Sequence, residues 1–186
     1  MPASTPGLRL AWAALGATLM ECGATSVGAS GERVSNQCFY LALAAAASPP
    51  GASIHAEARG LRRRIEAAVR EARPGWSDAD LLGREVGAFA DFLVWGLSST
   101  PLLAGRAVAV YNAPEGSCEI FRPPGAGALS RPVLAICHVP GQAGHYLWVR
   151  WGGAGGHPRL PRLLGLHRAG PANAPAVPTL VTSTAG

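Results

Sequence analysis

The strongest constraint on the fold is an apolar run from Cys38 to Ala47, which reads CFYLALAAAA. Alanine is the best helix former, and the Ser48-Pro49-Pro50 sequence that follows ends a helix because proline lacks the N–H that the next turn needs. The run has no polar face, so as a helix it must be covered on every side. We therefore expect a buried helix at the centre of the domain, with Cys38 in its first turn.

Helices are predicted before strands along the chain. Apolar residues recur at three- and four-residue spacing between His55 and Arg73, which predicts an amphipathic surface helix. A third helix should begin at Ser77, a good N-cap residue, and end at Trp95-Gly96. Short Val-rich and aromatic segments typical of strands come next. These segments are residues 107–111, 118–121, 132–139 and 145–151. Helices followed by a small, mainly antiparallel sheet indicate an α+β fold.

The length and composition suit one domain with loose ends. The chain has 186 residues, of which 48% are hydrophobic, enough for one sizeable core. We divide it into an N-terminal extension over residues 1–30, a central domain over 31–151 and a tail over 152–186. The tail is rich in Gly, Pro and Ala without a sustained pattern, so we expect it to be disordered.

The extension contains an apolar stretch from Leu10 to Met20 that follows Arg9, as in a secretory signal. The stretch is short and contains Trp12 and Gly16, so we interpret it as a short helix and expect a cytoplasmic protein, with secretion as the alternative. No apolar run reaches the roughly 20 residues needed to span a bilayer, so we predict no membrane span.

Charge and cysteine patterns exclude several classes of protein. The formal net charge is +5, all cationic side chains are Arg, and no arginine stripe alternates with aromatics, so nucleic-acid binding is not expected. The four cysteines form no CxxC pair and are sparse for this length, which disfavours a metal site or a disulfide scaffold. We expect no cofactor and reduced thiols.

A cysteine at a helix start and a histidine at a strand start suit a thiol protease. The thiolate is the nucleophile, and both a helix N-terminus and an imidazole favour it. Cys38 is the candidate nucleophile, and His145 is the candidate base that later protonates the leaving amine. Backbone amides in the turn formed by Ser35, Asn36 and Gln37 could hold the oxyanion.

The stretch Asn36–Leu43, NQCFYLAL, resembles the nucleophile motif of the ovarian-tumour (OTU) family of deubiquitinating cysteine proteases. Leu61-Arg62, Trp95-Gly96 and His145-Tyr146 resemble further family patterns in the family's order. The resemblance covers roughly residues 31–151. It implies a papain-like, OTU-like cysteine protease fold, with helices packed on the small sheet, that acts as a monomer on ubiquitin or a ubiquitin-like protein. It also implies Cys38 as nucleophile and His145 as general base.

The chain departs from the family at the residue that orients the histidine. The family places Asn or Asp two residues after the histidine, and Leu147 stands there. Glu32, Asn36 and Asn112 are candidates for the missing role. The departure leaves two alternatives beside a deubiquitinase that hydrolyses isopeptide or peptide bonds after the ubiquitin C-terminus. One is a viral-type polyprotein-processing protease of the same fold, and the other is a catalytically inactive ubiquitin-binding relative.

Overall fold

The structure, a computed structural model, describes residues 5–27, 30–31, 33–77, 93–113, 117–123, 133–139 and 145–152. Its helices are α1 (Thr5–Ala14), α2 (Cys38–Ala47), α3 (Ile54–Ala72) and α5 (Leu93–Ser99). Its strands are β1 (Ala17–Met20), β2 (Ser26–Val27), β3 (Arg33–Val34), β4 (Val108–Asn112), β5 (Ser117–Phe121), β6 (Leu134–Val139) and β7 (His145–Trp151). This mixture of helices with one main sheet agrees with the predicted α+β class.

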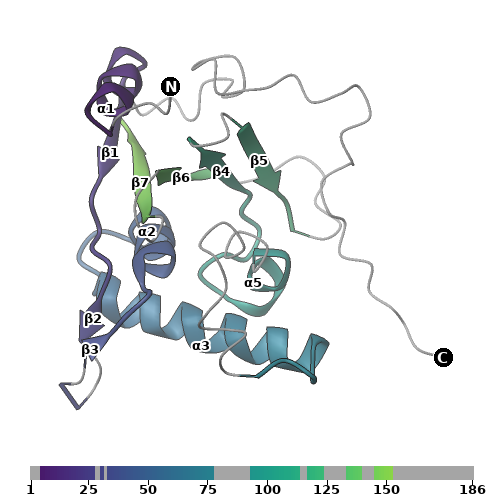
Figure 1. The fold of residues 1–186 in the computed structure, drawn as a ribbon. Coiled ribbons are helices and arrows are strands. Elements are labelled where there is room, and N and C mark those ends of the chain that lie inside the picture. Colours follow the sequence, from purple (N-terminus) through teal and green to yellow (C-terminus); the bar gives the residue numbers. More distant parts are fainter. Residues whose placement is uncertain are drawn as a thin grey trace, which may run out of the picture.

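The main sheet has five strands in the order β1-β7-β6-β4-β5 (Figure 1). Strands β4 and β6 run parallel, and the other three pairings are antiparallel. The predicted sheet is therefore mainly antiparallel, as expected. Strands β2 and β3 form a separate two-stranded sheet. The edge strand β1 was not predicted, and it pairs with β7 from Ala17 opposite Trp151 to Met20 opposite Trp148.

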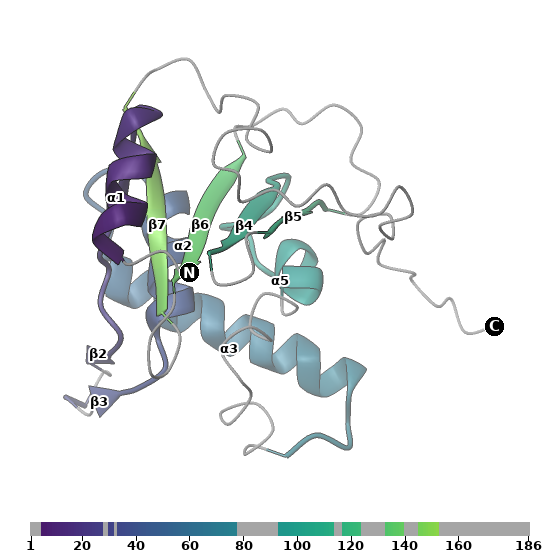
Figure 2. The ribbon, with the colours of Figure 1, turned by 45° about the horizontal axis from the view of Figure 1, so that its top comes forward.

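Helices cover both faces of this sheet (Figure 2). Helices α2, α3 and α5 share one hydrophobic core with the sheet face that carries Val110, Ile136 and Tyr146. Helix α1 lies on the opposite face, where Trp12 packs in a second core with residues such as Leu147. Strand β7 contributes to both cores because neighbouring side chains of a strand point to opposite faces.

Helix α2 is the central helix that the sequence predicts. All its residues except Ala46 are buried, and it packs against α3, β6 and β7. It ends where the Ser48 N–H donates to the Ala44 carbonyl, at the start of the Ser-Pro-Pro sequence. The predicted bounds and burial of this helix are confirmed.

Helix α3 confirms the predicted amphipathic pattern. Ser53 caps it by accepting from the Ala56 N–H, and Ala58, Leu61, Ile65 and Val69 form its buried stripe. The helix predicted from Ser77 lies largely outside the described residues. Trp95-Gly96 does not end a helix as predicted but lies within α5. Gly96 is needed there because a Cβ at this position would stand 2.8 Å from the Ile65 Cδ1 atom of α3.

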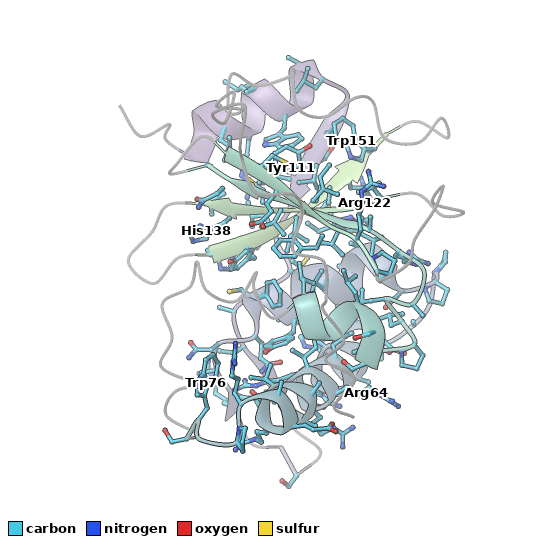
Figure 3. All side chains as sticks on the ribbon, turned by 90° about the vertical axis from the view of Figure 1, so that its right-hand side faces the viewer. Arg64, Trp76, Tyr111, Arg122, His138 and Trp151 are labelled. Atoms are coloured by element: carbon cyan, nitrogen blue, oxygen red, sulfur yellow. The ribbon has the colours of Figure 1, made fainter. Side chains whose placement is uncertain are left out.

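The N-terminal segment is packed into the fold. Trp12 is fully buried, and its ring makes edge contacts with those of Tyr111 and Trp151, both labelled in Figure 3. Gly16 has a φ of 78°, a conformation that glycine adopts without strain, and it separates α1 from β1. Arg9 Nη1 then ties the two elements together by donating to the Leu19 carbonyl at 2.7 Å.

The predicted disordered tail lies, from residue 153 onward, outside the described residues. No helix among the described residues is long and apolar enough to cross a membrane.

Candidate active site

Cys38 is the first residue of α2, and 8% of its surface is exposed. The next residue, Phe39, packs its ring edge-on against Tyr146 of β7, with 5.1 Å between the ring centroids. Both aromatic residues are buried, so this contact fixes the start of the helix against the start of the strand. The neighbours of these two rings, Cys38 and His145, are thereby brought together.

A side-chain hydrogen bond joins His145 to Cys38. This bond is the main reason that the pKa of His145 is raised from 6.5 to about 9. Partial burial lowers the pKa of His145, while the hydrogen bond and the negative charge of Glu21 raise it further. At neutral pH the ring is therefore protonated, and a cation beside a thiol favours the reactive thiolate.

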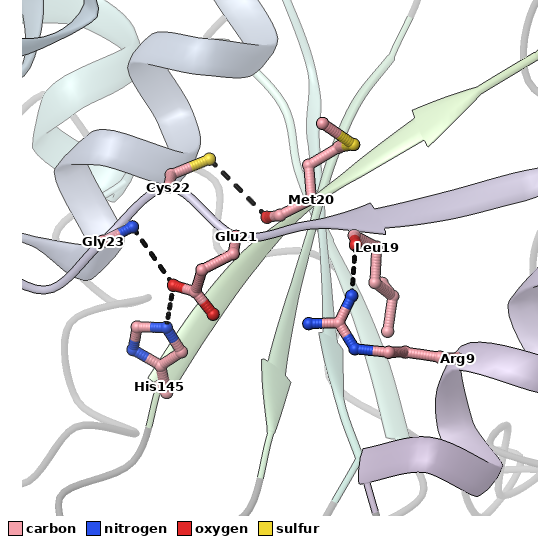
Figure 4. A network of polar contacts seen from close by, with 7 residues as sticks. All are labelled: Arg9, Leu19, Met20, Glu21, Cys22, Gly23 and His145. Carbon is pink, nitrogen blue, oxygen red and sulfur yellow. Dashed lines mark hydrogen bonds and ion pairs between the residues drawn. The ribbon is translucent and has the colours of Figure 1, made fainter.

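Glu21 is the third member of this cluster. It follows β1 directly, and its Oε1 atom lies 2.5 Å from His145 Nε2 (Figure 4). The same oxygen accepts from the Gly23 N–H at 3.1 Å. Gly23 has a φ of 86°, which allows the chain to turn back toward the carboxylate. Because Nε2 faces Glu21, Nδ1 is left for Cys38, and the three side chains form a row that we call the Cys38–His145–Glu21 row.

The turn before Cys38 leaves one backbone donor available. The Gln37 N–H donates to the Ala24 carbonyl at 3.0 Å, so it cannot serve an oxyanion. Asn36 has a left-handed φ of 55°, which Asn adopts more readily than most residues. The Cys38 N–H makes no hydrogen bond with the described residues, as expected for the first turn of a helix. This donor is the one placed to hold an oxyanion next to the sulfur.

Arg62 of α3 holds the same turn from behind. Its Nη1 donates to the Ser35 carbonyl at 2.9 Å, and the buried Gln37 side chain donates to that carbonyl at 3.5 Å. Arg62 Nε bonds to Glu66 at 2.6 Å, and the guanidinium lies 5.8 Å from the centre of the Tyr40 ring. Ser35, Gln37 and Arg62 thus shape the turn, while the Cys38 amide faces the reaction.

The structure places the other predicted orienting residues elsewhere. Asn112 Oδ1 lies 3.2 Å from Nδ1 of His138, not beside His145. Leu147 is 1% exposed and lies in the core beneath α1, so it cannot orient His145. Asn36 is exposed in the turn before the nucleophile, and Glu32 lies outside the described residues.

The remaining cysteines lack the environment of Cys38. All four thiols are free. Burial raises the pKa of Cys22, of Cys118 to about 11, and of Cys137 to about 12, so these thiols stay protonated at neutral pH. The described residues contain no group of His, Cys, Asp and Glu side chains that could hold a metal ion.

Glu21 is the site residue that the sequence analysis missed. It stands 124 positions before His145, so no local pattern connects the two residues. One signal was available, because Glu21 is the only carboxylate before Glu32. An isolated charge at the end of an apolar stretch could have been considered as a candidate partner for the histidine.

Comparison with known proteins adds no relative, because no family model, curated protein or solved structure matches the chain. The functional argument therefore rests on the geometry of the site and on the sequence motifs.

Proposed function

We propose that this chain is a thiol hydrolase of the OTU type that cleaves the peptide or isopeptide bond after the C-terminus of ubiquitin or a ubiquitin-like protein. The observation that carries the proposal is the Cys38–His145–Glu21 row at the start of a buried helix. A nucleophile, a base in hydrogen-bond contact with it, and a third group that orients the base are the parts that covalent acyl transfer requires.

The chemistry follows from the positions of these groups. With the ring of His145 protonated, the Cys38 sulfur attacks the carbonyl carbon of the scissile bond, and the Cys38 N–H stabilises the oxyanion. Collapse of the tetrahedral intermediate breaks the C–N bond, and His145 gives its proton to the leaving amine. The neutral ring then takes a proton from water, whose oxygen attacks the thioester. The acid is released, and the proton returns to the Cys38–His145 pair. Glu21 holds the ring in place throughout.

The choice of ubiquitin rests on the motif resemblance, which includes NQCFYLAL, Leu61-Arg62 and His145-Tyr146. The contact between Glu21 and His145 favours an active enzyme over an inactive relative, because it supplies the orienting group that Leu147 cannot. We further propose that the enzyme has an OTU-like, papain-like fold and acts as a monomer in the cytoplasm.

The test is labelling with a ubiquitin probe that carries a thiol-reactive group at its C-terminus. We expect one covalent adduct on the parent chain and none on Cys38→Ala. The matched control is Cys118→Ala, which removes a half-buried thiol from β5 and should retain the adduct.

An adduct on Cys38→Ala, or none on a folded parent chain whose Cys38 reacts with iodoacetamide, would refute the proposal. In the second case the nucleophile would be competent while ubiquitin was not its substrate. A parent chain whose Cys38 reacted no faster than a free thiol would instead indicate an inactive site.

A further inference from the structure

A pocket of about 410 Å³ opens beside the proposed active site, and we call it the flank pocket. The sheet contributes Met20 at the end of β1 and Trp148 of β7, which lie opposite each other in the strand pairing. Helix α2 contributes Ala45, and the start of α3 contributes Ile54. The lining is thus mainly apolar, and Glu21 stands at its edge.

The flank pocket is continuous with the catalytic row through Glu21. One oxygen of this carboxylate bonds to His145, and the same side chain lines the pocket. Neither Cys38 nor His145 lines it. Because the two ring nitrogens of His145 serve Cys38 and Glu21 respectively, the ring stands between the nucleophile and the pocket.

This position bears on which half of a substrate could reach the pocket. The leaving amine must receive its proton from His145, so the leaving-group half of the substrate passes the histidine. The flank pocket lies beyond the histidine as seen from Cys38, on the path of that half. An acyl group held at the Cys38 amide would extend from the other side of the sulfur.

We propose that the flank pocket binds an apolar side chain of the polypeptide on the leaving-group side of the scissile bond; this inference rests on the proposed thiol hydrolysis. Ile54 and Leu10 are the large apolar side chains exposed among the described residues, and Ile54 lies on this pocket. The Glu21 carboxylate at the edge disfavours an acidic residue in the same place, since like charges repel. Selectivity should therefore favour leucine over aspartate near the new N-terminus.

The experiment compares leaving groups attached to one acyl group. One substrate is ubiquitin carrying aminomethylcoumarin, and two are ubiquitin followed by a short peptide with Leu or Asp at its second position. The variants are Ile54→Arg and Ala52→Phe, which place a charge or a ring at the pocket, and the matched control is Leu10→Arg. Leu10 is 73% exposed on α1 and lies outside the pocket.

We expect the parent chain to prefer the leucine peptide to the aspartate peptide. Both pocket variants should lower kcat/KM for the leucine peptide about tenfold relative to the coumarin substrate, the scale for a partly buried apolar side chain. Leu10→Arg should not change this ratio. Thermal unfolding shows whether each variant is folded, and the two pocket variants provide independent tests.

If the parent chain cleaves all substrates but the ratio stays the same in both pocket variants, the pocket assignment is wrong and the hydrolase proposal stands. If the parent chain cleaves none of them, the hydrolase proposal fails, and the pocket assignment fails with it.

Discussion

Replacing Glu21 with Gln tests the role of the carboxylate with the smallest change in shape. Gln keeps an oxygen that can accept from His145 Nε2, but it removes the negative charge that helps to raise the pKa of His145. Glu21 is 53% exposed and the His145 side chain 27% exposed, so solvent screens their interaction. Such a pair contributes up to about 1 kcal/mol. Since 1.36 kcal/mol corresponds to one pKa unit, the pKa of His145 should fall by less than about one unit.

The assay is the pH dependence of kcat/KM, together with a titration of His145 by NMR. In the parent chain, activity should fall as pH rises through about 9, because the leaving amine needs the proton of His145. In Glu21→Gln this limb should move to lower pH, and kcat at neutral pH should fall by no more than about tenfold because the ring keeps an acceptor. Glu21→Ala, which removes the acceptor as well, should reduce kcat further.

Stability gives a second test with a defined sign. A His145 pKa raised from 6.5 to about 9 stabilises the folded chain fully below pH 6.5, and this contribution is lost as pH rises through about 9. The difference in free energy of unfolding between parent and Glu21→Gln should therefore be larger at pH 6 than at pH 9.5. Glu71→Gln, which removes an exposed carboxylate near the end of α3, is the control for net charge. The reasoning is refuted if Glu21→Gln matches this control and leaves the titration of His145 unchanged.

Two further substitutions test the elements that hold the row together. Arg62→Ala removes the hydrogen bond to the Ser35 carbonyl and should lower the free energy of unfolding by about 1–3 kcal/mol in a denaturant titration. It should also lower kcat while Cys38 still reacts with iodoacetamide, and an unchanged kcat would contradict the role given to Arg62. Trp12→Ala should cost about 3–5 kcal/mol by the same titration, because the ring is fully buried, and a loss below about 1 kcal/mol would contradict its structural role.

The sequence was most informative where structure depends on neighbouring residues. The alanine run after Cys38 and the Ser-Pro-Pro sequence after Ala47 define α2 locally, so its bounds could be predicted to the residue. The spacing of Leu61 and Ile65 likewise predicts the buried stripe of α3. The start of β7 at His145 follows from its alternating aromatic and aliphatic residues.

The sequence was least informative where structure depends on distant residues. Strand β1 has four residues, too few for a clear alternation, and it is extended because β7 offers it a partner. Gly16 ends α1 after Ala14, so an apolar stretch that resembles one helix divides into a helix and a strand. Trp95-Gly96 resembles a helix end by composition, but the closeness of Gly96 to Ile65 keeps it within α5.

The Cys38–His145–Glu21 row draws each member from a different part of the fold. Cys38 depends on the core beneath α2, while Glu21 follows an edge strand whose other residues pack beneath α1. The two cores meet at β7, which carries His145 at its start. Damage to the second core should therefore displace Glu21 before it disturbs the contact between Cys38 and His145. Under conditions where Trp12→Ala remains folded, we expect its Cys38 to keep its thiol reactivity while its pH profile approaches that of Glu21→Ala.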